Sequence, residues 1–406
     1  MVRIKVVKGT HQIGGCITVI STENSKIVID FGEDLDEEAK KHVDKERLLR
    51  EIEGADKVFI THSHGDHVGL VNLIPEAIPV FMEEMTKRII DIGADFGVNA
   101  PLEREVSTFH LYKDADNDPI DAGDFQVTPY IVDHSSYNSC MFLIEAEGKR
   151  ILHTGDYRSH GRKGGIFAST LEKIGHVDCL ITEGTTLSRS ESERYMSEFK
   201  LEKKAKELFS EYDQIFVLAS STNLDRVVSF YKAKGDKSIV FDTFTSAVTE
   251  AVDFKITGKT SGVYRWDPIR YRNSKSEKFK KKYMDNSFDY GFLPKYIMFL
   301  KPSMLLDVRK LKKEGLITKA CLVYSMWNGY LKKDKKLQEL VSEIEKMGID
   351  FRELHTSGHA DAQTMKKMNE ALKPDHTIVI HTEDGSKGDA VFDNTVALED
   401  GEIYEL

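Results

Sequence analysis

The chain has 406 residues, of which 40% are hydrophobic and 31% charged, and its formal net charge is −10. This length exceeds one ordinary hydrophobic core and suits two domains, and the composition is that of a globular protein rather than a disordered one. The acidic balance argues against a general nucleic-acid coat protein. It does not argue against a nuclease, whose metal ligands are acidic and whose substrate channel alone must be positive.

Nothing in the composition suggests a membrane or an oxidising compartment. No apolar run approaches the length that spans a bilayer, and the first eight residues alternate like an edge strand rather than a signal peptide. The four cysteines are far apart and lie among apolar neighbours. We therefore expect a cytoplasmic protein with reduced, buried thiols and no membrane partner.

The first part of the chain is typical of short strands separated by helices. The expected strands are 4–8, 16–21, 26–31, 58–61, 125–132, 139–146 and 150–154. A helix is expected at 85–96. Strands of this length and spacing, with helices between them, indicate a layered α/β fold.

From about residue 190 the pattern changes to a strict alternation of helices and strands. The expected helices are 193–212, 223–234, 302–314 and 333–347, and the expected strands are 214–219, 238–242 and 320–325. Such alternation indicates a parallel, doubly wound sheet. A strand at 351–356, a helix at 362–372 and a strand at 377–381 follow. The simplest layout is a first domain formed by residues 1–190 and 351–406, interrupted by an α/β domain at 191–350.

One segment opposes the acidic trend of the chain. Between Lys259 and Lys282, nine Lys and Arg residues stand against one Asp and one Glu, a local net charge of +7, with Tyr264, Trp266 and Tyr271 interleaved. This pattern fits a solvated helix face. It also fits a lip that contacts phosphates and stacks bases.

The strongest chemical signal is an H-x-H-x-D-H segment at residues 62–67. His62 and His64 are alternate residues at a strand end, so both can bind one metal ion from the same side. Asp66 and His67 follow a turn and can bind a second ion. Imidazole nitrogen and carboxylate oxygen are ligands that suit zinc. A surface histidine cluster is the alternative, but 14 histidines in 406 residues rarely assemble this pattern by chance.

Three further candidate ligands stand at the ends of apolar strands. His134 follows Ile131-Val132-Asp133, Asp156 stands in a Gly-Asp turn after Ile151-Leu152, and His381 ends Ile378-Val379-Ile380. A lone histidine at a strand end is usually structural. Three such residues in a chain that already contains H-x-H-x-D-H favour metal binding.

This set of motifs resembles the metallo-β-lactamase superfamily. The resemblance implies an αββα sandwich and two zinc ions, with manganese as the alternative metal. It implies two ligand sets that share a bridging Asp156: His62, His64, His134 and Asp156 for one ion, and Asp66, His67, Asp156 and His381 for the other. Asp30, which ends Ile27-Val28-Ile29, corresponds to an acidic residue that supports a ligand rather than binding the metal.

Three other motifs resemble the nuclease branch that carries an inserted β-CASP domain, and are most similar to the ribonuclease J family. They are the acidic segment around Glu183, the His355-Thr356-Ser357-Gly358-His359 segment, and the final segment from Lys373-Pro374 to His381-Thr382-Glu383. The resemblance implies an α/β class fold, in which a doubly wound β-CASP domain interrupts the sandwich. It also implies that His355, Ser357, Gly358 and His359 bind the phosphate of the substrate.

The chain departs from the ribonuclease J pattern at several points. Its acidic motif reads Glu183-Gly184-Thr185-Thr186 where that family has Asp-Ser-Thr-Asn, its final motif reads His-Thr-Glu rather than His-Gly-Glu, and the sequence ends at Leu406 without the family's C-terminal domain. These differences leave the fold and the metals as expected, and they leave the substrate and the mode of attack open.

The implied mechanism is phosphodiester hydrolysis by a hydroxide that two metal ions activate. His359 would donate to the scissile phosphate, Glu183 would orient and charge His359, and Asp66 would hold the proton of the hydroxide. The expected substrate is single-stranded nucleic acid, with RNA favoured and DNA as the alternative. The oligomeric state is open.

Two other classes of function fit part of the sequence. A small-molecule metallohydrolase, acting on a lactone, a thioester or a cyclic phosphodiester, explains the metals but neither residues 357–359 nor the inserted domain. A non-catalytic nucleic-acid-binding protein predicts broken ligand motifs, and none is broken here. We therefore expect a zinc-dependent hydrolase that acts as a nuclease.

Overall fold

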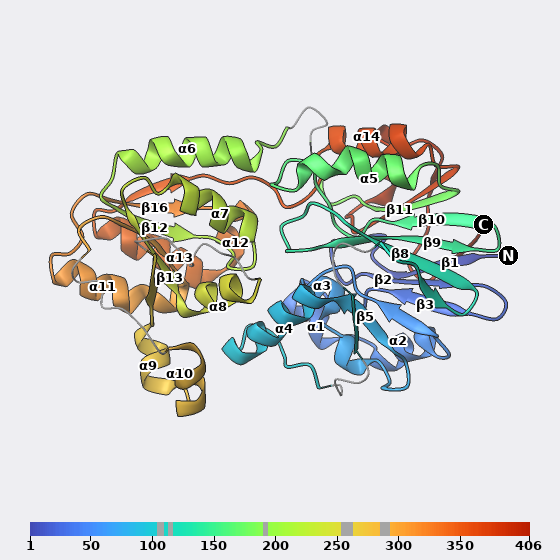
Figure 1. Cartoon of the computed structure of the whole chain (residues 1–406), viewed down its shortest axis with the longest axis horizontal. Helices are drawn as coiled ribbons and strands as arrows, with labels where there is room; N and C mark the ends of the chain where they lie inside the picture. Colours follow the sequence, from blue (N-terminus) through green and yellow to red (C-terminus); the bar gives the residue numbers. More distant parts are fainter. Residues whose placement is uncertain (104–108, 113–116, 190–193, 253–262, 285–292) are drawn as a thin grey trace. The chain divides into compact units, whose positions relative to one another are not determined.

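The computed structural model describes residues 1–103, 109–112, 117–189, 194–252, 263–284 and 293–406 (Figure 1). The chain divides into two compact units. The first consists of Met1–Tyr195 and Gly358–Leu406, and the second of Met196–Ser357. The chain therefore leaves the first unit and later returns to complete it.

Two seven-stranded sheets form the first unit. One has the order β20-β1-β2-β3-β4-β5-β6, with β1 (Arg3–Lys8), β2 (Ile17–Ser21), β3 (Lys26–Ile29), β4 (Lys57–Phe59), β5 (Val80–Glu83), β6 (Phe109–Tyr112) and β20 (Ile403–Glu405). The other has the order β19-β18-β11-β10-β9-β8-β7, with β7 (Ile120–Ala122), β8 (Phe125–Ile131), β9 (Cys140–Ala146), β10 (Lys149–His153), β11 (Cys179–Glu183), β18 (His376–Ile380) and β19 (Thr395–Val396).

The first unit also contains helices. They are α1 (Glu37–Lys41), α2 (Lys45–Ile52), α3 (Gly65–Val68), α4 (Glu84–Phe96), α5 (Phe167–Ile174) and α14 (Ala362–Leu372), with short 3-10 turns η1 (Val71–Leu73), η3 (Gly164–Ile166) and η6 (Gly385–Ala390). Of these, α2, α4, α5 and α14 pack on the outer faces of its sheets. One buried cluster lies between the sheets and includes Ile27 and Phe142. A second joins α2 and α4 to the first sheet, and a third joins α5 and α14 to the other. These four layers are the expected αββα sandwich.

Local sequence explains where a helix such as α14 begins and ends. The Asp361 side chain accepts a hydrogen bond from the backbone N–H of Thr364 and so caps the first turn. Met365, Met368 and Leu372 recur at helical spacing and are buried against the sheet. Lys373 adopts a left-handed conformation at the helix end and precedes a proline, which stops the helix.

The second unit is a doubly wound, six-stranded parallel sheet in the order β14-β13-β15-β12-β16-β17. Its strands are β12 (Gln214–Leu218), β13 (Ser238–Asp242), β14 (Val263–Trp266), β15 (Tyr296–Phe299), β16 (Ala320–Tyr324) and β17 (Asp350–Glu353). Its helices are α6 (Glu198–Ser210), α7 (Leu224–Ala233), α8 (Thr243–Ala251), α9 (Ile269–Ser274), α10 (Glu277–Tyr283), η5 (Pro302–Met304), α11 (Leu305–Lys313), α12 (Asn328–Lys333) and α13 (Lys335–Lys346).

Both faces of this parallel sheet are covered. Leu201 of α6 and Phe230 of α7 pack on one face, and Leu311 of α11 and Leu340 of α13 pack on the other. The inner strands are accordingly largely apolar, as in β12, which is buried at all five residues, whereas the edge strand β17 is mostly exposed.

Several element boundaries differ from the sequence predictions. The helix predicted at 193–212 begins at Glu198, because the Ser197 side chain caps its first turn, and the start of that prediction lies outside the described residues. The helix predicted at 333–347 is preceded by a separate short helix, α12, and Asp334 caps the start of α13. The boundary predicted at 350 falls too early, because β17 pairs in parallel with β16 and so belongs to the second unit.

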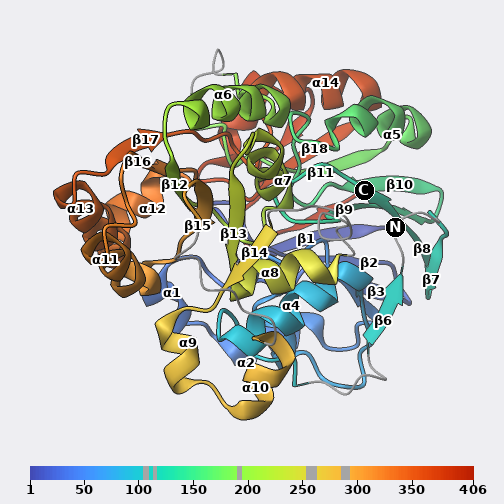
Figure 2. The same cartoon turned by 60° about the vertical axis from the view of Figure 1, so that its left-hand side comes forward.

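The described aromatic residues of the basic stretch are buried or half-buried, so none presents a fully exposed ring for stacking. Trp266 is 3% exposed, and the Arg272 guanidinium lies 4.6 Å from the centre of its ring. Lys275 lies over the rings of Tyr271 and Phe279. Figure 2 shows α9, which carries Tyr271 and Arg272, and α10, which carries Phe279, as a pair at the edge of the second unit. Lys259 lies outside the described residues.

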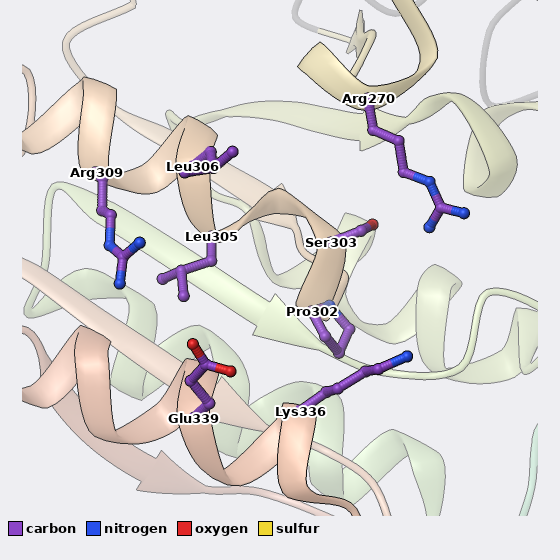
Figure 3. Close-up of a pocket in the computed structure, with 8 residues that line it drawn as sticks. All are labelled: Arg270, Pro302, Ser303, Leu305, Leu306, Arg309, Lys336 and Glu339. Carbon is purple, nitrogen blue, oxygen red and sulfur yellow. The ribbon is translucent and has the colours of Figure 1, made fainter. Parts of the chain in front are cut away.

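The second unit also contains a pocket of about 560 Å³ between α9, the η5–α11 segment and α13. It is lined by Arg270, Pro302, Ser303, Leu305, Leu306, Arg309, Lys336 and Glu339. Figure 3 shows Arg270 and Lys336 at one end of this pocket, and Arg309 and Glu339 at the other. None of the predicted metal-binding or phosphate-binding residues lines it. No helix in the described part of the chain combines the length and the apolar composition needed to cross a membrane.

Candidate metal centre

The ends of four strands of the first unit carry the predicted ligands. The segment after β4 carries His62, His64, Asp66 and His67, the segment after β8 carries His134, the turn after β10 carries Asp156, and His381 follows β18. Glu183 ends β11, which pairs in parallel with both β10 and β18. The carboxyl ends of neighbouring parallel strands meet at one edge of a sheet, so these side chains converge there.

One oxygen of Asp156 lies at the centre of the cluster. Its Oδ2 atom is 3.3 Å from Nε2 of His67 and 3.8 Å from Nε2 of each of His62, His134 and His381. Asp156 is 2% exposed. A single buried carboxylate that faces this many imidazoles is placed to bridge two ligand groups.

The first ligand group consists of three imidazoles whose nitrogens point at one another. Nδ1 of His64 is 3.0 Å from Nε2 of His62 and 3.2 Å from Nε2 of His134. Burial lowers the pKa of all three histidines, most strongly for His62 and His134. Neutral imidazoles present lone pairs, so this group together with Asp156 suits a metal ion.

The second ligand group contains Asp66, His67 and His381. Nε2 of His381 lies 3.2 Å from Oδ2 of Asp66. Burial alone would lower the pKa of His67, but the carboxylates of Asp156, Asp30 and Asp66 raise it well above its usual value. A site whose carboxylates hold a proton on a buried histidine is a site that also favours a metal cation.

Two atoms of the centre test directly whether a metal fits. Both atoms are buried: Oδ1 of Asp156 has no hydrogen-bond partner among the described residues, and Nε2 of His67 has only the 3.3 Å ion-pair contact with Oδ2 of Asp156. Buried polar atoms are nearly always hydrogen-bonded, so an unsatisfied pair within one cluster calls for an explanation. Coordination of a metal ion by these atoms supplies one, and the donor set of imidazole and carboxylate fits zinc.

Other groups hold the ligand rings in position through their outer nitrogens. Nδ1 of His67 lies 2.7 Å from Oδ2 of Asp30, and Nδ1 of His381 lies 2.7 Å from Oγ1 of Thr185. Nδ1 of His134 lies 2.8 Å from the carbonyl oxygen of Gly358, and Nδ1 of His62 lies 2.9 Å from Oγ1 of Thr61. Such contacts fix which ring nitrogen faces the metal.

Asp30 binds the chain that carries the first motif as well as His67. Its carboxylate accepts hydrogen bonds from the backbone N–H of Thr61 at 2.7 Å and from Oγ1 of Thr61 at 2.9 Å. Asp30 has a φ of 60° and His381 a φ of 52°. Residues other than glycine adopt this left-handed region at a cost in free energy, and such strain is concentrated at functional sites.

His359 and Glu183 form an ion pair beside the ligands. Nδ1 of His359 lies 2.9 Å from Oε2 of Glu183 and 3.7 Å from Oδ2 of Asp156. Burial lowers the pKa of His359, but the two carboxylates outweigh that effect and raise it to about 9. The His359 side chain keeps 24% of its surface exposed, whereas Glu183 is 1% exposed. The pair therefore presents an imidazolium that an incoming anion can reach.

Only part of the predicted phosphate-binding segment joins this cluster. Gly358 packs so closely that a Cβ atom there would lie 2.5 Å from Oγ of Ser135, which requires glycine at this position. His355 and Ser357 belong to the second unit. There Nδ1 of His355 lies 3.4 Å from the Arg226 guanidinium, so the role of these two residues stays a prediction.

Three residues of the centre were not predicted from the sequence. Thr61 and Thr185 contact ligand rings, and Cys16 lies with His67 and His381 in a group whose candidate ligand atoms are all within 4.8 Å of one another. Burial and the neighbouring carboxylates raise the pKa of the Cys16 thiol well above its usual value. The only sequence signals for these residues are their positions beside motifs, and Cys16 has just the Gly14-Gly15 turn before it.

Comparisons with known proteins agree with this geometry. Residues 25–214 match the model of a beta-lactamase superfamily domain, and residues 337–390 match that of a Zn-dependent metallo-hydrolase RNA specificity domain. The chain is similar to the β-CASP branch of the metallo-β-lactamase superfamily. The two matches are separated by residues 215–336, which hold most of the inserted sheet.

Relatives within the β-CASP branch are moderately similar in sequence. Ribonuclease J of Helicobacter pylori is 26% identical over 204 residues, a match that covers 47% of this chain and 28% of that protein. Probable RNase MJ4 of Methanocaldococcus jannaschii is 28% identical over 214 residues, 48% of each chain. The matched region thus spans less than half the length of either relative.

A solved structure extends the likeness to the whole chain. A protein of unknown function from Enterococcus faecalis V583 superimposes with a TM-score of 0.76 at 20% sequence identity, and the match covers 100% of both chains. At this identity the likeness concerns the fold alone. It shows that a sandwich interrupted by an inserted sheet also occurs in another chain.

Proposed function

We propose that this chain is a two-metal nuclease that hydrolyses phosphodiester bonds of single-stranded RNA. The observation that carries the proposal is the convergence on Asp156 of two ligand groups and of the ion-paired His359. Ligands alone would suit any metallohydrolase. A buried carboxylate that charges a reachable imidazole beside them suits a substrate with anionic oxygens.

The two ligand groups would each hold one ion, with Asp156 shared. His62, His64 and His134 complete one group, and Asp66, His67 and His381 complete the other. When bound, zinc or manganese ions would lower the pKa of a water molecule and neutralise charge on the phosphodiester. Asp30, Thr61 and Thr185 would keep the ligand rings in their orientations.

His359 would act on the substrate rather than on the metals. Its imidazolium would donate a hydrogen bond to a non-bridging oxygen of the scissile phosphate, where negative charge grows during attack. Glu183 would hold the ring in place and keep it protonated. Asp66, with its carboxylate at the same edge, would hold the proton of the attacking hydroxide by accepting a hydrogen bond from it, and the attack would break the bond between phosphorus and the 3′-oxygen. The products would then carry a 5′-phosphate and a 3′-hydroxyl.

RNA is the proposed substrate because the domain match and the names of two relatives both refer to RNA. The C-terminal part of the chain matches an RNA specificity domain, and two relatives are named as ribonucleases. His355, Ser357 and Gly358 would help to bind the phosphate, since they are contiguous with His359 in the sequence.

The test is a cleavage assay with chemically matched substrates. Metal-loaded full-length chain is incubated with end-labelled single-stranded RNA and DNA of the same sequence and with the RNA duplex, beside the Asp156→Asn variant. We expect a product ladder from single-stranded RNA, slower cleavage of the duplex, and loss of both in the variant. Hydrolysis of a lactone or thioester without any nucleic acid cleavage would contradict the proposal and favour a small-molecule metallohydrolase.

A further inference from the structure

The second unit presents an exposed pair of aromatic side chains at the carboxyl end of β16. Trp327 is 45% exposed and Tyr330 is 52% exposed. Their ring centres are 5.5 Å apart and the rings are nearly perpendicular, at 87°. Together with four nearby lysines, this pair forms what we call the aromatic–lysine surface: Trp327, Tyr330, Lys332, Lys333, Lys335 and Lys336.

The backbone holds the Trp327 ring where it is. A Cβ atom at Gly329 would lie 2.2 Å from two atoms of that ring, so the indole packs directly on the glycine backbone. The Tyr324 hydroxyl donates a hydrogen bond of 2.9 Å to the Trp327 carbonyl, and the Asn328 amide donates one of 2.9 Å to Glu353. The indole face is thereby presented in a fixed position without being covered.

Four lysines follow the aromatic pair directly. They are Lys332, Lys333, Lys335 and Lys336, all exposed. Among the residues that the structure describes, none of the four forms an ion pair. The only acid among them, Asp334, accepts hydrogen bonds from the backbone N–H groups of Lys336 and Leu337. In a chain of net charge −10, this is a local surplus of positive charge without paired carboxylates.

The position of the surface in the fold favours ligand binding. In an open parallel sheet, ligands bind at the carboxyl ends of the strands, near the point where the strand order reverses. In this sheet the order reverses between β15 and β12, and β16 is the next strand beyond β12. Lys336 also stands beside Arg270 at one end of the pocket in Figure 3, which adds another cation to this side of the unit.

We infer that the aromatic–lysine surface binds a single strand of RNA. Bases stack on the exposed faces of Trp327 and Tyr330, and the lysines contact the phosphates on either side, which is how strands without paired bases are held. A duplex keeps its bases stacked on one another and cannot use the rings. The inference rests on the proposed function for the choice of RNA, and it concerns residues outside the metal centre.

The chain offers a fluorescence readout for this inference. It has two tryptophans, and Trp266 is 3% exposed. Metal-loaded full-length protein is titrated with a short phosphorothioate-linked single-stranded RNA that resists cleavage. We expect quenching of tryptophan emission on binding, and loss of most of that quenching in Trp327→Phe. Trp327→Ala is expected to weaken binding roughly tenfold.

Matched variants separate three possible causes of weaker RNA binding: loss of stacking, loss of positive charge, and disturbance of the fold. Gly329→Ala keeps the indole but displaces it, and should weaken binding as Trp327→Ala does. Phe199→Ala removes an aromatic side chain of α6 that is 58% exposed. This variant should bind RNA with the wild-type affinity. Lys332→Glu with Lys333→Glu should lower the salt dependence of binding by about 0.7 for each phosphate that is no longer neutralised. The same double change to Glu at the exposed residues Lys312 and Lys313 of α11 should leave the salt dependence of RNA binding unchanged.

The outcomes distinguish this inference from the proposed function. RNA binding that quenches Trp327 in a protein that cleaves no RNA would refute the nuclease and leave the surface in place. Cleavage with unchanged affinity in Trp327→Ala, Gly329→Ala and the lysine variant would overturn the surface and leave the nuclease in place. Equal affinity for duplex and single strand would also overturn it.

Discussion

The candidate ligand histidines contact neighbours that carry no metal-binding chemistry of their own. Thr185 contacts the outer nitrogen of His381 at 2.7 Å and is 7% exposed. Thr186, the next residue, donates instead to the carbonyl oxygen of Ala360. Two neighbouring threonines of similar burial therefore differ in one respect, which is contact with a ligand ring.

Thr185→Val tests this dependence. Removing a hydrogen bond that orients a ligand typically lowers metal affinity by about 10- to 100-fold. We expect the wild type to hold close to two ions per chain, and the variant to lose one of them to a competing chelator at a correspondingly lower concentration. Elemental analysis after chelator titration measures this, with Thr186→Val as the control. If Thr185→Val and the wild type retain the same amount of metal at every chelator concentration, Thr185 does not orient His381 for metal binding.

His359 separates a nuclease from a general metallohydrolase. Removing one donor that stabilises developing negative charge typically costs about 2.7–4 kcal/mol, or about 10²–10³ in rate. His359→Ala should therefore keep its metals and its fold and cleave RNA at least about a hundredfold more slowly, because His359 is not expected to be a metal ligand. Glu183→Gln should show a milder defect, since it acts through His359.

Single-turnover cleavage measured beside metal content checks the prediction for His359. His376→Ala is the control, since that half-buried histidine lies at the start of β18, away from the ligand cluster. A metal-replete His359→Ala protein that cleaves RNA at the wild-type rate would remove the main reason to prefer a nuclease.

At the scale of single residues, the motifs predicted which candidate ligands lie together, but not the neighbours that contact them. The H-x-H-x-D-H spacing and the strand-end positions brought seven candidate ligands into view, and the structure places them in one cluster. Thr185 could not be recognised, because a hydroxyl that contacts a ring leaves no pattern along the sequence. The left-handed backbone at Asp30 and His381 was equally hidden, since both are ordinary non-glycine residues there.

Elements of the second unit are joined by a buried ion pair. Arg226 of α7 and Glu198 of α6 are both fully buried, and Nη2 of Arg226 lies 2.9 Å from Oε1 of Glu198. Arg226 also donates to the carbonyl oxygens of Ser325 and Thr356, which follow β16 and β17. One side chain thus ties two helices to the ends of two strands, including the chain that leads toward His359.

Arg226→Met should strongly destabilise the second unit. Breaking a buried pair by removing one partner costs about 3–5 kcal/mol, because the other charge stays buried without compensation. Arg309→Met is the matched control, since the Arg309–Glu343 pair is 45% and 25% exposed and solvent-exposed pairs contribute little to stability. Urea unfolding measures both. Similar losses of stability in the two variants would show that burial of the pair is not what matters.

The bounds of a helix or strand were predictable where the spacing of apolar residues and a capping residue indicate the same end. They were not predictable where only one of these signals is present. Helix α14 was predicted at 362–372 and is found there, because its apolar spacing, its Asp361 cap and its stop at Lys373-Pro374 all agree. Strand β15 was missed, although Tyr296-Ile297-Met298-Phe299 is a continuous apolar run. Such a short run does not distinguish a strand from a buried helix turn. Pairing with β12 and β13 decides it.

On the scale of the molecule, the alternation of elements predicted an interrupted domain but not where its cores are. In the inserted sheet, β15 lies between β13 and β12. No local sequence pattern predicts this crossover. The likeness to the Enterococcus faecalis structure at 20% identity shows that the same arrangement is compatible with very different sequences. Fold is therefore set by where apolar residues recur, and function by the few residues at strand ends.

Metal ions should stabilise only one of the two units. All candidate ligands lie within residues 1–195 and 358–406, and each unit has its own buried clusters. A ligand that binds only the folded state stabilises it by about 2.7 kcal/mol when its free concentration is about 100 times its Kd. For a unit of this size that shifts the unfolding temperature by roughly 5–10 °C.

Scanning calorimetry with and without a chelator therefore has a specific expected result. Two transitions should be seen, because each unit can unfold with its own core. Chelation should lower one of them by at least roughly 5 °C. Arg226→Met identifies the other, since it should lower that transition in the presence and absence of metal alike. If chelation and Arg226→Met lower the same transition, the two units unfold together and the metals stabilise the molecule as a whole.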